Sequence, residues 1–347
     1  MTVEVLVSAL IALTATFLGG QFLMPLLLQS GFIARDINKK NRPVLPVGGG
    51  PILAFGFFFG VLALLFSLNY LTTANINIEL VLIALVSVVA ISFVGFLDDL
   101  IGGGVRTSKV NALKIAKNYT FFNGGIKQWQ KPLLTLIAAL PLIAINWGAP
   151  VINVPFIGGV QINQLIYAFL VIPAAVIFSA NAFNMLEGLN GISVQMGLVA
   201  FLAIAIFAYH TQEYTAFAIA TIFSGALIGY LYYGAYPAKI LPGDSLTYFI
   251  GAGFAATIII GNLQLLGILL IIPWIIEFAL KARKHFHANS WGLLQRNGTL
   301  KSPHGQNIYS LTHLFLRTGR FKEWQITSLL TIIEIVIATL SLVLLWS

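Results

Sequence analysis

Residues 93–100 read FVGFLDDL, an apolar run that ends in two adjacent carboxylates, Asp98 and Asp99. Only 11 of the 347 residues are acidic, so two acids directly after a hydrophobic stretch need a reason. Carboxylates at the end of a membrane helix are often no more than a solvated stop. The nearby Arg106 and Lys109 favour a second interpretation, in which the pair lies beside a bound phosphate.

Composition indicates a membrane protein. Hydrophobic residues make up 58% of the chain, charged residues make up 9%, and the mean hydropathy is +0.91, whereas about 25% of the residues of a soluble domain are charged. A transmembrane helix needs roughly 20 apolar residues to cross about 30 Å of hydrocarbon, so the length accommodates about ten helices. We therefore predict an all-α polytopic membrane protein with about ten transmembrane helices, in which residues 1–347 form a single integral membrane domain. The ten apolar runs lie near 3–28, 47–70, 79–97, 132–146, 162–181, 191–209, 214–233, 244–261, 263–281 and 324–346.

Composition also limits the chemistry and the partners. The chain has no cysteine, which excludes disulfides, thiolate metal sites and a cysteine nucleophile. The first apolar run lacks the basic leader and the small-residue cleavage site of a signal peptide, so we expect it to be retained as a span. The net charge of +8 favours phosphates and anionic membrane lipids as partners. It does not indicate nucleic acid, because that role needs a soluble basic face with interleaved aromatic residues.

The basic residues predict the topology, because Lys and Arg concentrate in cytoplasmic loops. Ten spans place both termini outside, and all 19 Lys and Arg residues then fall in inner loops or at inner helix ends. The outer loop at 151–162 has the weak alternation and the central Gly-Gly pair of a small β-hairpin. The outer loops, which contain no Lys or Arg, are 71–78, 147–161 and 210–213. The inner loops expected to form the active-site face are 29–46, 98–131, 182–190, 234–243 and 282–323.

A second polar stretch, NAFNMLEGLNG at 181–191, follows the fifth apolar run. Its Asn181, Asn184, Glu187 and Asn190 recur every three residues, so a helix end would bring them to neighbouring faces. The amides could instead cap the helix, and the glycines could simply turn the chain. Three amides and an acid at a membrane boundary favour a binding role.

A third stretch, LPGDSLT at 241–247, opens the eighth apolar run. Asp244 is suited to cap the N-terminus of that helix. It is equally suited to a hard cation, since Mg²⁺ binds one or two carboxylate or amide oxygens together with phosphate oxygens and water. Asp244 and Asn184 would supply such a partial shell for Mg²⁺, with Mn²⁺ as the alternative ion.

A fourth stretch, KARKHFH at 281–287, contains Arg283, His285 and His287. A basic run of this kind is commonly an anchor on the cytoplasmic side. Beside a site that holds acids for Mg²⁺, the same side chains are suited to bind a diphosphate or to stabilise developing charge.

Together these stretches resemble the polyprenyl-phosphate N-acetylhexosamine-1-phosphate transferase family, also called glycosyltransferase family 4. The resemblance covers nearly the whole chain, and its motifs occur in the family's order and on one membrane face. The motifs are RPVLPVGGG at 42–50, FVGFLDDL at 93–100, NAFNMLEGLNG at 181–191, PGDSLTYFIGA at 242–252 and the His/Arg segment.

The resemblance implies an inner-face active site and Mg²⁺-dependent transfer of a sugar-1-phosphate from a UDP-sugar to a polyprenyl or dolichyl phosphate, with release of UMP. Asp244 and Asn184 then match the metal ligands. Asp98 and Asp99 match the catalytic or positioning pair. A homodimer is also implied. The residues expected to bind substrate are Lys109, Arg106, Asn181, Glu187, Asn190, Arg283, His285 and His287.

Two departures bear on the substrate. The pentapeptide translocases of the family are expected to read NxxNxxDGxDG, whereas this chain has Glu187 and Asn190 at the two aspartate positions, and it lacks their longer histidine string. These differences favour the dolichyl-phosphate GlcNAc-1-phosphate transferase branch, with UDP-GlcNAc as donor in the first membrane step of a glycan assembly such as N-glycosylation. HFHANSWG at 285–292 is not the compact Arg-His-Arg run of that branch. UDP-MurNAc-pentapeptide and UDP-GalNAc therefore stay open as alternative donors.

A secondary transporter or lipid flippase would also use intramembrane carboxylates and broken helices. Such a protein should carry polar residues near mid-membrane and a repeat between its halves, whereas here the acids and amides gather at inner helix ends. We therefore favour the enzyme. Its expected location is the cell membrane of an archaeon or another prokaryote, with the active site in the cytoplasm.

Overall fold

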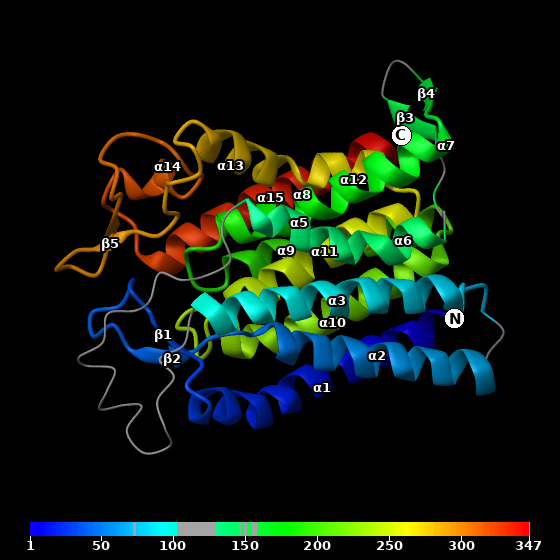
Figure 1. Cartoon of the computed structure of the whole chain (residues 1–347), viewed down its shortest axis with the longest axis horizontal. Helices are drawn as coiled ribbons and strands as arrows, with labels where there is room; N and C mark the ends of the chain where they lie inside the picture. Colours follow the sequence, from blue (N-terminus) through cyan, green and yellow to red (C-terminus); the bar gives the residue numbers. More distant parts are fainter. Residues whose placement is uncertain (72–73, 103–128, 146–147, 149–150, 155–157, 347) are drawn as a thin grey trace.

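The computed structural model describes residues 1–71, 74–102, 129–145, 148, 151–154 and 158–346. Long helices lie side by side along the long axis of the molecule (Figure 1). The unbroken ones are α1 (Thr2–Gln29), α2 (Gly50–Tyr70), α3 (Ile78–Gly102), α9 (Ile192–His210), α10 (Tyr214–Gly234), α11 (Gly243–Ile260) and α15 (Glu323–Trp346). The segmented ones are α5 (Gln130–Thr135) with η1 (Leu136–Ala139) and α6 (Leu140–Ala144); α7 (Gln164–Ile166) with η2 (Tyr167–Val171) and α8 (Ile172–Leu186); and α12 (Gln264–Leu270) with α13 (Ile272–Ala282). A short helix, α14 (His313–Leu316), lies outside the bundle of long helices.

The ten predicted apolar runs correspond to the helices of the described part of the chain. Eight helices there are long and apolar enough to cross a membrane, and the bent pair α12 and α13 makes a ninth if it is one span. The remaining segment, Gln130–Ala144, is apolar but shorter, and at 1.5 Å per residue it covers only about 22 Å. The prediction of an all-α polytopic membrane protein is confirmed.

Prolines explain where the segmented helices break. Pro141, Pro173 and Pro273 each lie in the first turn of a new helix: α6, α8 and α13. Proline has no backbone N–H to donate to the preceding turn, so it fits best where a helix begins. A 3₁₀ turn precedes α6, a π-helical turn precedes α8, and a 55° bend separates α12 from α13.

The described part of the chain also contains three antiparallel strand pairs. They are β1 (Ile33–Arg35) with β2 (Val44–Pro46), β3 (Val151–Val154) with β4 (Gly158–Gln161), and β5 (Leu293–Leu294) with β6 (Leu300–Lys301). The β3–β4 pair confirms the hairpin predicted for the outer loop. In Figure 1 the two chain termini lie at the end of the bundle that carries this hairpin, as an even number of crossings requires. The opposite end carries β1, β2, β5 and α14, and we call it the basic end.

Helix α11 lies at the centre of the bundle and fixes the basic end. It packs against α2, α3, α8, α9 and α10, and nearly all of its side chains are buried. Glycines allow two neighbours to approach its first turn closely. A Cβ added at Gly95 of α3 would lie 2.6 Å from Ser245 Cα, and one at Gly50 of α2 would lie 2.5 Å from the Ser245 carbonyl carbon. The N-terminus of α11 is therefore held between α2 and α3.

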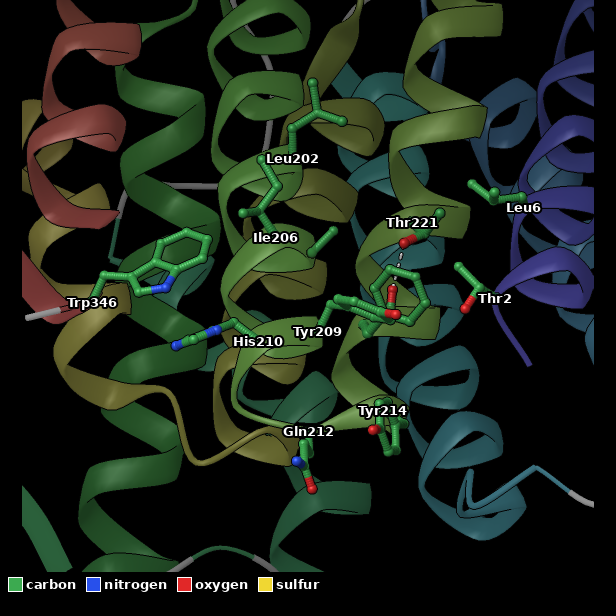
Figure 2. A pocket seen from close by; sticks show the side chains of 12 residues that line it. Thr2, Leu6, Leu202, Ile206, Tyr209, His210, Gln212, Tyr214, Thr221 and Trp346 are labelled. Carbon is green, nitrogen blue, oxygen red and sulfur yellow. Dashed lines mark hydrogen bonds between the residues drawn. The ribbon is translucent and has the colours of Figure 1, made fainter. Parts of the chain in front are cut away.

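A cavity of about 690 Å³ opens at the opposite end, beside the chain termini (Figure 2). Its lining comes from α1, α9, α10 and α15 and includes Leu6, Ile206, Tyr209 and Trp346. No Asp, Glu, Lys or Arg is among the described residues that line it. The described lining of this cavity therefore offers a phosphate group no Lys or Arg.

Candidate active site

The two predicted acids stand where the C-terminal part of α3 meets the first turn of α11. Asp99 accepts hydrogen bonds from the backbone N–H groups of Asp244, at 2.7 Å, and of Ser245, at 3.1 Å. A carboxylate in this position satisfies donors that a helix N-terminus leaves unpaired and interacts favourably with the helix dipole. Gly243 has φ +69°, and a Cβ there would lie 2.4 Å from Asp99 Oδ2. Asp99 thus caps α11 from a neighbouring helix, through a turn that only glycine fits.

Asp98 and Asp244 share one cation. Lys131 Nζ lies 2.6 Å from Asp98 Oδ2 and 2.5 Å from Asp244 Oδ2. The Asp98 side chain is buried, whereas Asp244 is 21% exposed. Because buried charges are costly unless they are paired, this triad holds the ends of α3, α5 and α11 together.

Asn181 and Asn184 lie on the last two turns of α8, which continues to Leu186 through much of the predicted inner loop 182–190. Asn181 Nδ2 donates to Thr135 Oγ1 at 3.1 Å and to the Ile177 carbonyl at 2.8 Å. Asn181, Asn184 and Asp244 face the same polar pocket of about 270 Å³. Its lining residues are Lys131, Asn181, Asn184, Met185, Glu187, Asp244, Lys281, Phe286, Ala288, Asn289, Ser290 and Trp291.

Glu187 lines this pocket, whereas Asn190 does not. Burial raises the pKa of Glu187 to about 7, and the nearby Glu323 carboxylate adds a smaller rise. Asn190 is buried elsewhere: its Nδ2 donates to Asp36 Oδ2 at 3.0 Å, and its backbone N–H donates to Glu323 Oε1 at 2.8 Å. Lys39 forms ion pairs with both of these acids. Asn190 therefore ties the loop after α8 to the loop after α1 and to α15.

The residues of the basic run at 281–287 lie in different surroundings. Arg283, His285 and His287 are exposed, and Arg283 lies over the Tyr309 ring at 5.9 Å. His285 and His287 line a second, mainly apolar cavity of about 520 Å³ between α5, α8 and α13. The two cavities share the lining residues Asn181, Met185 and Phe286.

Lys131 and Lys281 line the polar pocket, but neither was among the residues predicted to bind substrate. Lys131 was counted only with the charges of the inner side, and Lys281 only as part of the basic run 281–287. The sequence does contain one signal for Lys281: it lies four residues, about one helical turn, after the intramembrane acid Glu277. Lys131 is placed by tertiary packing alone.

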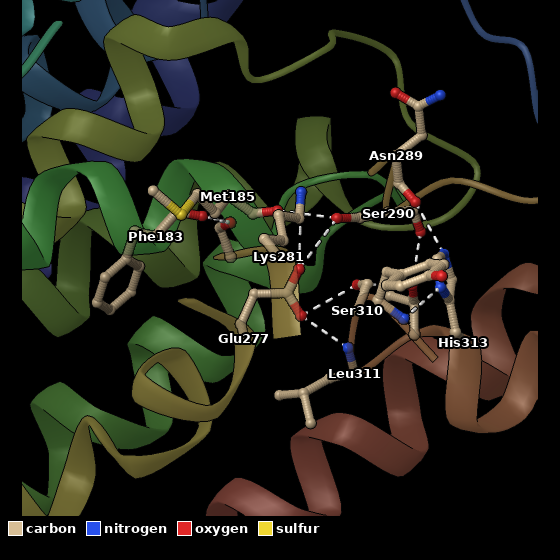
Figure 3. Close-up of polar contacts among 12 residues, drawn as sticks. Phe183, Met185, Glu277, Lys281, Asn289, Ser290, Ser310, Leu311 and His313 are labelled. Carbon is tan, nitrogen blue, oxygen red and sulfur yellow. Dashed lines mark hydrogen bonds and ion pairs between the residues drawn. The ribbon is translucent and has the colours of Figure 1, made fainter. Parts of the chain in front are cut away.

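Hydrogen bonds to neighbouring segments hold the pocket-lining residues 288–291 in place (Figure 3). Ser290 Oγ donates to the Met185 carbonyl at 2.8 Å, and His313 Nε2 donates to the Asn289 carbonyl at 2.8 Å. His313 Nδ1 accepts from the Tyr309 backbone N–H at 3.1 Å, so the ring is neutral with its proton on Nε2. Burial accordingly lowers the pKa of His313 to about 4.

The donor set of the pocket fits a hard cation that completes its shell with ligand oxygens. No group of three His, Cys, Asp or Glu side chains among the described residues is arranged to hold a metal ion by itself. Mg²⁺ needs only one or two protein oxygens beside phosphate and water, and Asp244 and Asn184 offer a carboxylate and an amide oxygen to one pocket. The buried Tyr248 hydroxyl, one turn after Asp244, lies close to both Asp244 and Asn184. Arg106 and Lys109, the predicted diphosphate contacts, lie outside the described residues.

The chain is similar to known proteins of one family along most of its length. The sequence model of glycosyl transferase family 4 matches residues 81–262. A protein of Sulfolobus acidocaldarius, provisionally named UDP-N-acetylglucosamine–dolichyl-phosphate N-acetylglucosaminephosphotransferase, is 34% identical over 344 residues, which are 98% of this chain and 95% of the relative. A protein of Saccharolobus solfataricus with the same provisional name is 35% identical over 324 residues, which are 91% of this chain and 89% of the relative. A phospho-N-acetylmuramoyl-pentapeptide-transferase of Clostridium perfringens is 28% identical over 280 residues, which are 79% of either chain.

Proposed function

Because the chain belongs to glycosyl transferase family 4, we propose that it transfers GlcNAc-1-phosphate from UDP-GlcNAc to dolichyl phosphate, giving dolichyl-diphosphate-GlcNAc and UMP. The family predicted from the sequence motifs is confirmed. So is the preference for the dolichyl-phosphate branch, since the relatives of 34% and 35% identity carry that name. The pentapeptide transferase is a more distant relative at 28% identity.

The observation that carries the proposal is the junction of two unlike cavities at the basic end. The polar pocket offers carboxylates, amides and lysines to a water-soluble nucleotide diphosphate. The adjoining cavity is lined by apolar side chains such as Pro132, Ile177 and Phe278, which suit a polyprenyl chain. Asn181 belongs to both linings. A lipid that lies in the apolar cavity can therefore present its phosphate to a nucleotide in the polar one.

In the proposed reaction an oxygen of the lipid phosphate attacks the β-phosphorus of UDP-GlcNAc. The bond between that phosphorus and the bridging oxygen breaks, and UMP leaves with the bonding electrons. A phosphate monoester with a second pKa near 6 is already largely ionised at neutral pH, so little base catalysis is needed. Positioning and charge neutralisation supply most of the acceleration in such transfers. Lys131 lines the polar pocket and contacts the buried Asp98, and Asp99 holds α11 in place.

The residues that would hold Mg²⁺, or Mn²⁺, are Asp244 and Asn184. When bound, the ion neutralises charge on the diphosphate oxygens. Lys131 contacts Asp244 through Oδ2, so this lysine and a cation compete for the same carboxylate.

The protein is an integral membrane protein, and its orientation is part of the proposal. Lys and Arg concentrate at the basic end, and the positive-inside rule assigns that end to the cytoplasm. The archaeal relatives support the cell membrane of an archaeon as its location. The homodimer implied by the family resemblance stays a prediction, which sedimentation in detergent would test.

The test is transfer of radiolabel from UDP-GlcNAc to dolichyl phosphate by the full chain in detergent with Mg²⁺. We expect activity from wild type and from the surface control Lys301→Gln, which removes the charge of an exposed lysine that does not line the polar pocket. We expect large losses from Asp244→Ala and Asn184→Ala, together with weaker Mn²⁺ binding measured by electron paramagnetic resonance. Full activity and unchanged Mn²⁺ binding in Asp244→Ala would remove the metal assignment.

A donor panel then separates the alternatives. Turnover of UDP-MurNAc-pentapeptide or UDP-GalNAc in preference to UDP-GlcNAc would move the protein to another branch of the family. Proton-coupled solute uptake into proteoliposomes, with no transfer to lipid, would favour the transporter instead.

A further inference from the structure

Lys281 occupies an unusual position in the wall of the polar pocket. It lies in the last turn of α13, and its side chain is only 10% exposed. The exposed surface belongs to the pocket, which Lys281 lines together with Lys131. The neighbouring Arg283, His285 and His287 are exposed on the protein surface.

The acid beside Lys281 already has its hydrogen bonds from other groups (Figure 3). Glu277 is fully buried, and its Oε2 accepts from the Leu311 backbone N–H at 2.7 Å and from Ser310 Oγ at 3.0 Å. Its Oε1 lies 3.3 Å from Ser290 Oγ, whose single proton is shared with the closer Met185 carbonyl at 2.8 Å. Two full donors and this weaker, shared hydroxyl thus hold the carboxylate in place without the lysine.

Lys281 Nζ lies 3.6 Å from Glu277 Oε1, which is an ion pair but too long for a hydrogen bond. Among the described residues the ammonium group has no hydrogen-bond acceptor closer than this. An ammonium carries three donors, and leaving them unsatisfied in a buried site is costly. Glu277 offsets the charge of Lys281, while the ammonium donors stay available on the pocket side.

We propose that Lys281 binds a phosphate oxygen of the nucleotide-sugar donor. The proposal rests on the proposed function, since it assumes that the polar pocket takes UDP-GlcNAc. The diphosphate is the charged part of that donor, whereas the sugar and the uracil are neutral, so a buried cation selects the phosphates. Lys131, on another helix, already contacts two carboxylates at 2.5 and 2.6 Å, whereas Lys281 has no hydrogen-bond acceptor among the described residues, so Lys281 is the lysine of this lining with most donors available to a ligand.

Glu277 holds the ammonium group of Lys281 in a fixed position. Because its carboxylate is anchored to Leu311, Ser310 and Ser290, it holds the ammonium of Lys281 at the end of a rigid helix. A charge fixed in a dry pocket stabilises an anion more than a mobile, solvated one does. Arg283, the exposed guanidinium of the same run, is screened by water.

The experiment compares UDP with uridine as probes, by calorimetry on the full chain in detergent with Mg²⁺. In Lys281→Gln we expect UDP affinity to fall about tenfold or more, as for one lost charge-assisted hydrogen bond. Uridine affinity should change less than about twofold, which also shows that the pocket is still folded. The matched control is Lys301→Gln, an equal charge change at an exposed lysine of β6, and it should change neither affinity.

A second variant keeps the test decisive if Lys281→Gln does not fold because Glu277 is left without a counterion. Glu277→Gln combined with Lys281→Gln removes both charges and should show the same selective loss of UDP affinity. Equal losses for UDP and uridine would assign Lys281 a structural role and overturn the inference, as would unchanged UDP affinity. If wild type transfers GlcNAc-1-phosphate while Lys281→Gln binds UDP normally, only this inference falls; if wild type binds no UDP, the proposed function falls with it.

Discussion

Asp99→Asn tests whether the second acid of the FVGFLDDL stretch positions the site or acts as a base. In the structure both Asp99 oxygens accept hydrogen bonds from the first turn of α11, one from the Asp244 N–H and one from the Ser245 N–H. An asparagine amide keeps one acceptor oxygen and turns an NH₂ group toward the other backbone N–H. It also removes the negative charge from the helix N-terminus. Asp244, the proposed metal ligand, begins this same turn.

The magnitude follows from these contacts. One lost hydrogen bond to a charged group costs about 1.5–3 kcal/mol. The lost interaction with the helix dipole adds about 0.3–1 kcal/mol. Asp99→Asn should therefore destabilise the fold by about 2–4 kcal/mol, which for a chain of this length corresponds to a fall in melting temperature on the order of 3–6 °C.

The assay combines thermal melting of the detergent-solubilised protein with transfer activity across a Mg²⁺ titration. If Asp99 positions α11, Asp99→Asn lowers the melting temperature, weakens the apparent Mg²⁺ affinity and reduces kcat together. The comparison variant is Asp98→Asn, which leaves the α11 cap intact and should lower the melting temperature less. Abolished activity with an unchanged melting temperature and Mg²⁺ affinity would refute the positioning argument and make Asp99 the base.

Three further changes test other parts of the structure. Gly243→Ala should abolish activity and lower the melting temperature, because its Cβ would meet Asp99 Oδ2 at 2.4 Å, whereas Gly298→Ala, also at positive φ but in open space, should cost only about 1–2 kcal/mol. Glu334 lies midway along α15 and is fully buried, and neither carboxyl oxygen has a hydrogen-bond partner among the described residues. Glu334→Leu should therefore stabilise the fold by up to about 3 kcal/mol and raise the melting temperature. An unchanged or lower melting temperature would show that a partner exists. The Glu187 pKa of about 7 lies above its ordinary value of 4.5, so this group contributes stability below pH 4.5 that is lost as pH rises through 7. His313, with its lowered pKa, acts in the opposite sense over an overlapping range, so the measurement is the difference in melting temperature between wild type and Glu187→Gln from pH 5 to 8, which should shift in favour of the variant as pH rises.

Much of the fold could be predicted because a membrane reduces the problem to apolar length and charge. Each apolar run became a helix or a chain of helical pieces, and the β3–β4 strand pair formed in the expected loop, although Gly158 and Gly159 lie in β4 and not at the centre of the hairpin. Helix breaks were harder to predict. Pro273 begins a new helix after a 55° bend, and neighbouring packing decides whether a proline kinks a span or ends a helix.

The polar residues show where sequence spacing stops being informative. Asn181 and Asn184 face the pocket together because both lie on α8, so the spacing of three held for them. The same spacing failed for Asn190, since the helix ends at Leu186 and Glu187 has extended backbone angles. From that point the chain no longer follows the helical repeat, and Asn190 reaches Asp36 instead. The contact of Lys131 with two acids had no local signal, because three helices far apart in sequence create it.

The charges around α11 explain why the site needs cations beyond Lys131. Asp98, Asp99 and Asp244 bring three carboxylates to one place, and Lys131 supplies one positive charge among the described residues that contact them. A diphosphate would add further negative charge, and two like charges 4 Å apart at a protein surface repel by about 4 kcal/mol. A divalent cation at Asp244 and Asn184 would offset part of this negative charge. The phosphates would then need a cation that no carboxylate has already bound through hydrogen bonds. Lys281 meets that condition, because the hydrogen bonds of Glu277 are made with the backbone and with serine hydroxyls.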